Sequence, residues 1–196
     1  MLLHVCCASC ALPIIKHFFS DLPPHQKFWC GGLKEEDIAL YFFNPNLFKE
    51  EEYLKRLKEV EKIASIYKLK LYSEKYNHNQ WLNFIKENLP RPPDEYQEND
   101  ERCLVCFKFR LNQTALFAKT HGFYEFATTL SVSRYKDVKF INQYAKSLAK
   151  KYGLKYKTFS LDQQKAHQTG INLSKKYNLY RQKYCGCEFS LPAPSA

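Results

Sequence analysis

The amino terminus delivers three thiols directly from a short apolar segment. Residues 2–5 predict a buried strand, and Cys6, Cys7 and Cys10 follow it with no polar linker between strand and thiols. In an open α/β sheet, ligands bind in the crevice beyond the carboxyl ends of the strands. A single buried cysteine is an ordinary small core residue, whereas three within five positions indicate a functional site.

Two further cysteine pairs follow, Cys103 with Cys106 and Cys185 with Cys187. The first pair is spaced i, i+3 at the predicted start of a helix, where the helix dipole favours the thiolate form. Gly186 lets the backbone fold tightly between the second pair. Four thiolates complete one zinc site or one iron–sulfur cluster, so seven candidates exceed a single centre. We expect all three clusters to meet at one edge of a sheet.

Composition limits the classes of protein that remain. No apolar run approaches the roughly 20 residues that span a bilayer, and no signal peptide is evident, so we expect a cytoplasmic protein without membrane contact. That compartment keeps thiols reduced, which favours metal or redox roles for the eight cysteines. Cys30 stands alone and is expected not to ligate. A net charge of +10 predicts an anionic partner, first of all nucleic acid.

Strand and helix patterns alternate along the chain. This alternation predicts an α/β domain with an open, mostly parallel, Rossmann-like sheet and helices on both faces. The expected strands are 2–5, 38–43, 69–72, 123–128 and 154–159, and the expected helices are 13–19, 50–67, 80–89, 103–121, 137–152 and 168–177. We expect one catalytic domain over residues 1–190, with an insertion at 20–37 and a flexible tail at 191–196. No glycine-rich phosphate loop occurs, so dependence on ATP or NAD is unsupported.

Polar and aromatic residues between these elements are candidates for substrate binding. The candidates are Asn44, Asn46, Thr128, Thr129, Tyr180, Arg181 and Gln182. The two threonines either meet a substrate or cap the next helix. The segment from Tyr180 to Tyr184 offers rings and a guanidinium suited to an unstacked RNA base, or else closes the core.

Several motifs occur together in a fixed order. They are LHVCCASC at 3–10, YFFNPN at 41–46, RCLVC at 102–106 followed by RL at 110–111, TTL at 128–130, and YRQKYCGC at 180–187. Their combination, spread over residues 2–190, resembles the epoxyqueuosine reductases of the QueH type. Ser9 and Arg134 stand where that family commonly has proline, and Cys30 lies outside the motif set.

The resemblance implies an oxidoreductase that reduces epoxyqueuosine to queuosine at the wobble position of tRNA, the last step of queuosine biosynthesis, with an external electron donor. It also implies a [4Fe–4S] cluster with a further iron beside it. We assign the cluster to Cys6, Cys7, Cys103 and Cys106. Cys10, Cys185 and Cys187 then bind the second iron, or Cys185 and Cys187 cycle as a redox-active dithiol. Tyr184 or a bound water supplies a proton.

Other readings of the same cysteines lead to different proteins. A zinc-stabilised RNA-binding module would be colourless and would lack reductase activity. A metal-free dithiol oxidoreductase would use Cys-x-x-C and Cys-x-Cys as exchange pairs, and loss of activity on iron removal would exclude it. An iron–sulfur sulfurtransferase is disfavoured because its nucleotide loop is missing.

Overall fold

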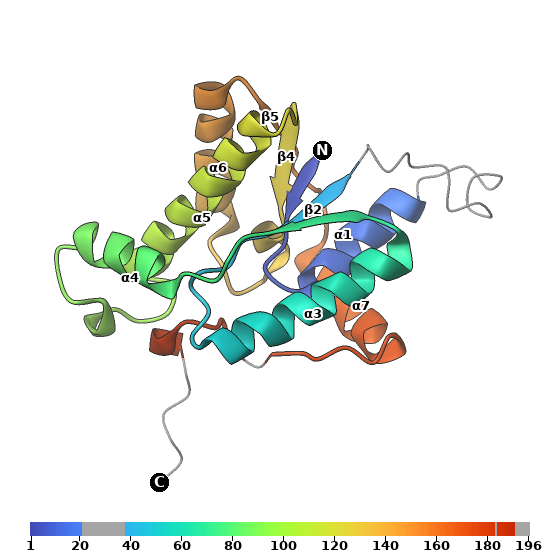
Figure 1. The fold of residues 1–196 in the computed structure, drawn as a ribbon, viewed down its shortest axis with the longest axis horizontal. Helices are drawn as coiled ribbons and strands as arrows, with labels where there is room; N and C mark the ends of the chain where they lie inside the picture. Colours follow the sequence, from blue (N-terminus) through green and yellow to red (C-terminus); the bar gives the residue numbers. More distant parts are fainter. Residues whose placement is uncertain (21–37, 183, 191–196) are drawn as a thin grey trace, which may run out of the picture.

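Five parallel strands form one sheet at the centre of the protein (Figure 1). The structure is a computed structural model, and it describes residues 1–20, 38–182 and 184–190. The strands are β1 (Leu2–His4), β2 (Ala39–Phe42), β3 (Lys70–Ser73), β4 (Glu125–Thr128) and β5 (Lys155–Tyr156). Their order across the sheet is β3-β2-β1-β4-β5. The strand order reverses on either side of β1, and such a switch point opens a crevice at the carboxyl ends of the strands.

Helices cover both faces of the sheet, as the sequence predicts (Figure 1). The α-helices are α1 (Ala8–Ser20), α3 (Glu50–Tyr67), α4 (His78–Glu87), α5 (Glu101–Thr120), α6 (Val138–Tyr152) and α7 (Gln163–Lys176). Three short 3₁₀ helices are η1 (Pro93–Glu95), η2 (Thr129–Val132) and η3 (Glu188–Ser190). One apolar core lies under α1, α3 and α7, and the other lies under α4, α5 and α6. The described residues thus form a single α/β domain.

The central strand β1 is buried on both faces. Leu2, Leu3 and His4 are all 0% exposed, because β1 pairs with β2 on one side and β4 on the other, and an apolar core covers each face of the sheet. Burial lowers the pKa of His4 to about 3, helped by the nearby Arg110 cation, so the ring is neutral. Its Nε2 donates to the Phe43 carbonyl at 3.1 Å, and its Nδ1 accepts from the Thr128 hydroxyl at 2.8 Å. His4 therefore locks three strands together just below the cysteines.

The strands β2, β3, β4 and β5 begin one or two residues later than the sequence predicts, and β4 and β5 show the reason. The Phe123 amide donates to the Ala118 carbonyl at 2.9 Å, and the Leu154 amide donates to the Ala149 carbonyl at 2.8 Å. Both residues therefore complete the end of the preceding helix instead of joining the sheet. Conversely, α7 starts earlier than expected, because the Asp162 carboxylate accepts from the Lys165 amide and caps the helix.

Parts of two expectations fall outside the described residues. They are residues 21–37 of the expected insertion, which include Cys30, and the expected tail at 191–196. Within the described part of the chain, none of the helices combines the length and the apolarity that crossing a membrane requires.

Candidate active site

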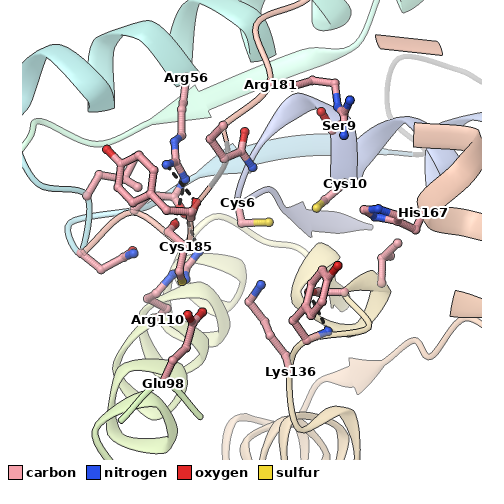
Figure 2. A pocket seen from close by; sticks show the side chains of 18 of the residues that line it. Cys6, Ser9, Cys10, Arg56, Glu98, Arg110, Lys136, His167, Arg181 and Cys185 are labelled. Carbon is pink, nitrogen blue, oxygen red and sulfur yellow. Dashed lines mark hydrogen bonds between the residues drawn. The ribbon is translucent and has the colours of Figure 1, made fainter. Parts of the chain in front are cut away.

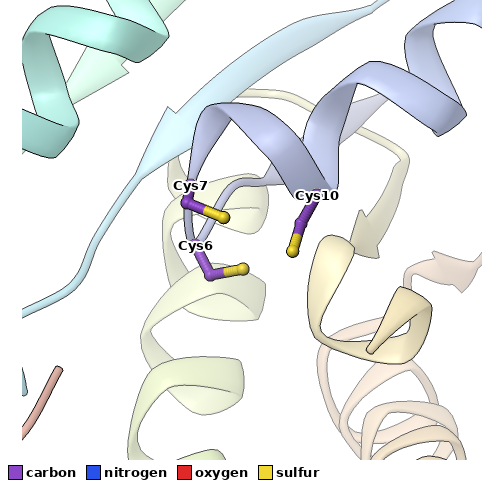
Figure 3. A group of neighbouring side chains, drawn as sticks. All are labelled: Cys6, Cys7 and Cys10. Atoms are coloured by element: carbon purple, nitrogen blue, oxygen red, sulfur yellow. The ribbon is translucent and has the colours of Figure 1, made fainter. Parts of the chain in front are cut away.

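The first three motif cysteines form a compact cluster at the carboxyl end of β1. We call Cys6, Cys7 and Cys10 the strand-end group (Figure 3). Their sulfur atoms all lie within 4.8 Å of one another, which is close enough for one metal ion. Cys7 is buried, and the other two are half-buried. The spacing follows from local structure, because the chain leaves the strand at Cys6 and starts α1 at Ala8, so that Cys10 turns back towards the strand end.

The strand-end group favours one thiolate. Hydrogen bonds from Cys10 and Cys7 lower the pKa of Cys6 well below its usual value, outweighing burial, and the cations Lys136 and Arg110 act in the same direction. The pKa of Cys10 is raised well above its usual value, because its hydrogen bonds to Cys6 and Cys7 favour the protonated thiol and burial adds to this effect. Thiolate is the form that binds metals, so Cys6 is prepared as a ligand.

Thr129 fixes the position of Cys6. Its hydroxyl oxygen accepts from the Cys6 amide at 3.0 Å and donates its proton to the Cys6 sulfur at 3.2 Å. Thr128, one residue earlier, contacts His4 and accepts from the Leu130 amide at 3.1 Å. Both threonine hydroxyls are therefore engaged with protein groups that hold the site.

A second set of cysteines reaches the same region from the end of the chain. We call residues 184–190 the terminal cysteine segment. Arg56 of α3 donates to the Cys185 carbonyl at 2.9 Å and to the Tyr184 carbonyl at 3.5 Å. Glu52 orients this guanidinium through a contact of 2.7 Å. The segment is therefore held by a buried arginine side chain rather than by a strand or a long helix.

Gly186 allows the terminal cysteine segment to lie this close to α3. Its φ is +125°, and a Cβ at this position would clash with Leu47 Cδ2 and lie 3.0 Å from the Arg56 guanidinium. The Gly186 carbonyl also accepts from the Phe48 amide at 2.8 Å. Only glycine meets both demands, the conformation and the close contact.

The cysteine pair of α5 lies beside the terminal cysteine segment. Burial raises the pKa of Cys106 to about 12, and the nearby sulfurs of Cys185, Cys103 and Cys187 raise it too. Burial likewise raises the pKa of Cys187 to about 11, with contributions from Cys185 and Cys103. These mutual effects place the four sulfurs in one electrostatic neighbourhood. All seven motif cysteines thus gather at the carboxyl edge of the sheet.

A cavity of about 420 Å³ opens between the two cysteine sets (Figure 2). Cys6, Cys10 and Cys185 line it. Lys136 extends its amine towards the middle of this space (Figure 2). Burial lowers the pKa of Lys136, but the nearby sulfurs of Cys185, Cys6 and Cys10 outweigh this and raise it. The cavity therefore combines thiols with a fixed positive charge.

The substrate-binding candidates divide into two sets. Asn44, Asn46, Arg181 and Gln182 line the cavity, as does Tyr184, the candidate proton donor. Thr128, Thr129 and Tyr180 are not among the lining residues, and the Tyr180 hydroxyl instead donates to Glu52. Their assignment to the substrate stays a prediction, as does the division of cysteines between cluster and second iron. The strand-end group places Cys10 beside Cys6 and Cys7, whereas we assign Cys10 to the second iron.

Sequence reasoning missed three cations of the site. Arg56 resembles any polar residue on an amphipathic helix, and Lys136 resembles a solvated lysine of a polar loop. Arg110 belongs to a quoted motif, but nothing in its sequence context indicates that it is buried, 2% exposed, and bonded to the Asn44 side chain. The sequence holds no signal for these three roles, because only the folded chain brings the three cations close to the sulfurs.

Asn46 carries a polar atom that is ready for a ligand. The residue is 2% exposed and lines the cavity, and its Oδ1 has no hydrogen-bond partner among the described residues. Leaving a buried acceptor unpaired costs about 1–3 kcal/mol. A donor supplied by a bound molecule would remove this cost.

The family model and the similar proteins all point to the same protein family. The family model described as "Epoxyqueuosine reductase QueH" matches residues 1–193. A protein of that name from Thermotoga maritima is 32% identical over 194 residues, covering 97% of this chain and 90% of the relative. Another from Haemophilus influenzae is 30% identical over 192 residues, covering 97% and 71%. A third, from Staphylococcus epidermidis, is 28% identical over 196 residues, covering 97% and 75%.

Proposed function

Because the chain belongs to the epoxyqueuosine reductase QueH family, an oxidoreductase family, we propose that it reduces epoxyqueuosine to queuosine at the wobble position of tRNA. This reaction would be the last step of queuosine biosynthesis and would take place in the cytoplasm. The observation that carries the proposal is the family match over nearly the whole chain. The presence of three motif cysteines, Cys6, Cys10 and Cys185, in the lining of one cavity supports it.

The reaction consumes electrons and protons, and a pair of cysteine thiols can supply both. Converting an epoxide to an alkene takes two electrons and two protons, and the oxygen leaves as water. Cys185 and Cys187 are free thiols, and closing them to a disulfide releases two electrons and two protons. An external electron donor would then reduce the disulfide again. Gly186 keeps both thiols on one short turn, as this role requires.

The donor set fits an iron–sulfur centre. Thiolates are the usual ligands of such clusters, and the four cysteines that we assign to the [4Fe–4S] cluster are buried or half-buried. Cys6, Cys7, Cys103 and Cys106 would hold the cluster, and Cys10 would share the second iron with the Cys185–Cys187 pair where that pair is not a disulfide. When bound, this centre supplies electron transfer and a Lewis acid.

Lys136 is placed to act on the oxygen that leaves. Its amine lies in the cavity, and its raised pKa keeps it a protonated hydrogen-bond donor. We assign to Lys136 the donor role towards the epoxide oxygen, next to the Tyr184 hydroxyl that we expect from the sequence. A charged donor aimed at developing negative charge is worth about 100-fold in turnover.

Variants at Lys136 test this role. Lys136→Met should lower kcat about 100-fold while KM and the iron content stay close to wild type. Lys139→Met removes an exposed lysine three residues away and serves as the control. Tyr184→Phe tests the rival donor. Unchanged kcat in Lys136→Met, or a larger loss in Tyr184→Phe, would assign the role to the tyrosine or to water.

We propose that Asn46 recognises the base of the modified nucleoside through a hydrogen bond. Its unpaired Oδ1 would accept from an N–H group on the edge of the base. Arg110 holds the neighbouring Asn44 side chain, which in turn donates to the Val5 carbonyl at 2.9 Å. The asparagine turn is therefore fixed before the substrate arrives, which reduces the entropy cost of binding.

The direct test combines metal analysis with an activity assay. Anaerobically purified protein should contain iron and acid-labile sulfide in a ratio above one, should be brown, and should convert epoxyqueuosine tRNA to queuosine tRNA when a reductant is supplied. Zinc without sulfide, together with no conversion, would favour the zinc-stabilised RNA-binding module. Full conversion after iron removal would favour a metal-free dithiol enzyme.

A further inference from the structure

Tyr135 is a large aromatic side chain left open to solvent at the mouth of the cavity. It is 56% exposed. The large apolar side chains exposed among the described residues are Leu54, Ile66, Leu116, Tyr124 and Tyr135. Within this set, Tyr135 alone lines the cavity. An exposed ring beside a binding cavity indicates contact with a partner more strongly than a scattered surface residue does.

The neighbours of Tyr135 fix the orientation of its ring. The Arg134 guanidinium lies 4.6 Å from the ring centroid and donates a hydrogen bond to the Tyr135 hydroxyl. The His167 ring of α7 meets Tyr135 edge-on, with the centroids 6.3 Å apart. We call Arg134, Tyr135 and His167 the rim platform. Its three side chains come from two elements, and the tyrosine ring is still more than half exposed.

The loop that carries Tyr135 is held at both ends. Before it, the Ser131 hydroxyl donates to the Thr128 carbonyl at 2.9 Å. After it, the Asp137 carboxylate accepts from the Phe140 amide at 2.9 Å and caps α6. Within it, the Ser133 carbonyl accepts from Gln163 of α7 at 3.4 Å. A platform ordered in advance costs little entropy when a ligand stacks on it.

Positive charge surrounds the rim platform. Besides partial burial, Arg134 and Arg181 lower the pKa of His167, so two guanidinium groups lie near this imidazole. Both arginines are exposed, and Arg181 also lines the cavity. Exposed arginines next to an open aromatic ring are the groups that bind single-stranded RNA, where phosphates meet cations and bases stack on rings.

The volume of the cavity limits how much of an RNA loop can enter it. A volume of about 420 Å³ is in the range of small-molecule sites. It suits one nucleoside that has left the stack, as enzymes that modify a single base require. The flanking nucleotides of the same RNA loop then remain outside, next to the rim platform.

We propose that Tyr135, supported by Arg134 and His167, stacks against an unpaired RNA base directly adjacent to the nucleoside that enters the cavity. The inference rests on the proposed function, since it takes the cavity as the place of the modified nucleoside. It adds the residue that recognises the neighbouring nucleotide. Stacking of one base on an aromatic ring contributes enough to change affinity about 10-fold.

The test is RNA binding to the metal-containing protein, measured without an electron donor. The probe is an anticodon stem-loop RNA carrying epoxyqueuosine, and two further RNAs have an abasic nucleotide on one or the other side of it. Tyr135→Ala should weaken binding of the intact RNA about 10-fold, whereas Tyr135→Phe should bind like wild type. On one of the abasic RNAs the effect of Tyr135→Ala should disappear, because the stacked base is missing.

Tyr124→Ala is the matched control. Tyr124 is 67% exposed, and it lies at the opposite end of β4 from the cavity. Its removal should change neither affinity nor KM. Equal binding by wild type and Tyr135→Ala, or an effect of Tyr135→Ala that persists on both abasic RNAs, would overturn the stacking role. Stacking-dependent binding without any reduction would instead overturn the proposed function alone, so the two failures are distinguishable.

Discussion

The strand-end group and the terminal cysteine segment bring sulfur to the same cavity by different means. Cys6 follows β1 directly, and hydrogen bonds of the sheet and of α1 fix the backbone on either side of the group. The terminal cysteine segment belongs to no strand, and its backbone is held by Arg56 and by the Phe48 amide. One set is positioned by secondary structure, and the other by a few tertiary contacts.

This difference suits the two tasks that we propose for the cysteines. A cluster needs ligands that stay in place through many cycles, and a group anchored on a central strand supplies them. A dithiol that opens and closes needs both sulfurs on one short turn, which Gly186 allows outside the sheet. Damage to the strand-end group should therefore abolish the metal site. Damage to the anchors of the terminal cysteine segment should lower turnover more than metal content.

The largest effect is expected from Cys6→Ser. The lowered pKa of Cys6 favours its thiolate form, and its sulfur receives the Thr129 hydrogen bond, so we expect metal binding to depend on Cys6. The variant should lose bound iron and sulfide together with all measurable turnover. Metal analysis and the tRNA reduction assay check both losses. Cys30→Ser should keep both, since Cys30 lies outside the motif set. A Cys6→Ser protein with full iron content would contradict the central role of this group.

A smaller and more selective effect is expected from Gly186→Ala. The new methyl group would clash with Leu47 and Arg56, and φ of +125° strains any residue with a side chain. We expect turnover to fall about 100-fold through misplacement of the two thiols. The free energy of unfolding should fall by about 1–3 kcal/mol. Iron bound by the remaining ligands should be largely retained.

Gly153→Ala is the matched control for the backbone strain that a side chain causes at positive φ. Gly153 also has a positive φ, +68°, but a Cβ there meets nothing within 4 Å, and it ends α6 away from the cavity. Its substitution should cost about 1 kcal/mol of stability and leave turnover unchanged. Equal losses of turnover in the two variants would mean that general destabilisation, not the position of the thiols, explains the effect at Gly186.

The two cysteine sets also differ in how much of their arrangement the sequence predicts. The strand-end group is a local feature, so alternation and spacing were sufficient to place it, and the helix at 50–67 was predicted with its observed bounds. Arg56 lies on that helix, but its contact with Cys185 joins positions 129 residues apart, and no local pattern encodes such a contact. Thr129 was predicted to meet a substrate or to cap the next helix, and no local pattern predicted the hydrogen bond that its hydroxyl donates to the Cys6 sulfur.

The smallest effect concerns the attachment of the terminal cysteine segment to α4. His78 Nε2 lies 3.1 Å from Glu188, and Tyr76 and Trp81 pack around the imidazole. Burial lowers the pKa of His78, but the Glu188 carboxylate and two backbone carbonyls outweigh it, so the net shift is upwards. A raised pKa in the folded state means that the pair stabilises the protein fully below the unfolded-state pKa of about 6.5. The stabilisation is lost as pH rises through the raised value.

Comparison of wild type with Glu188→Gln isolates this pair from other titrating groups. The difference between their free energies of unfolding should be about 1 kcal/mol at pH 5.5 and should become smaller by pH 8.5. Urea unfolding at both pH values measures it. A difference that does not change with pH would mean that Glu188 acts by packing alone. In that case only neutral contacts would attach the terminal cysteine segment to α4. Arg56 of α3 would then supply the charged contacts that hold the segment.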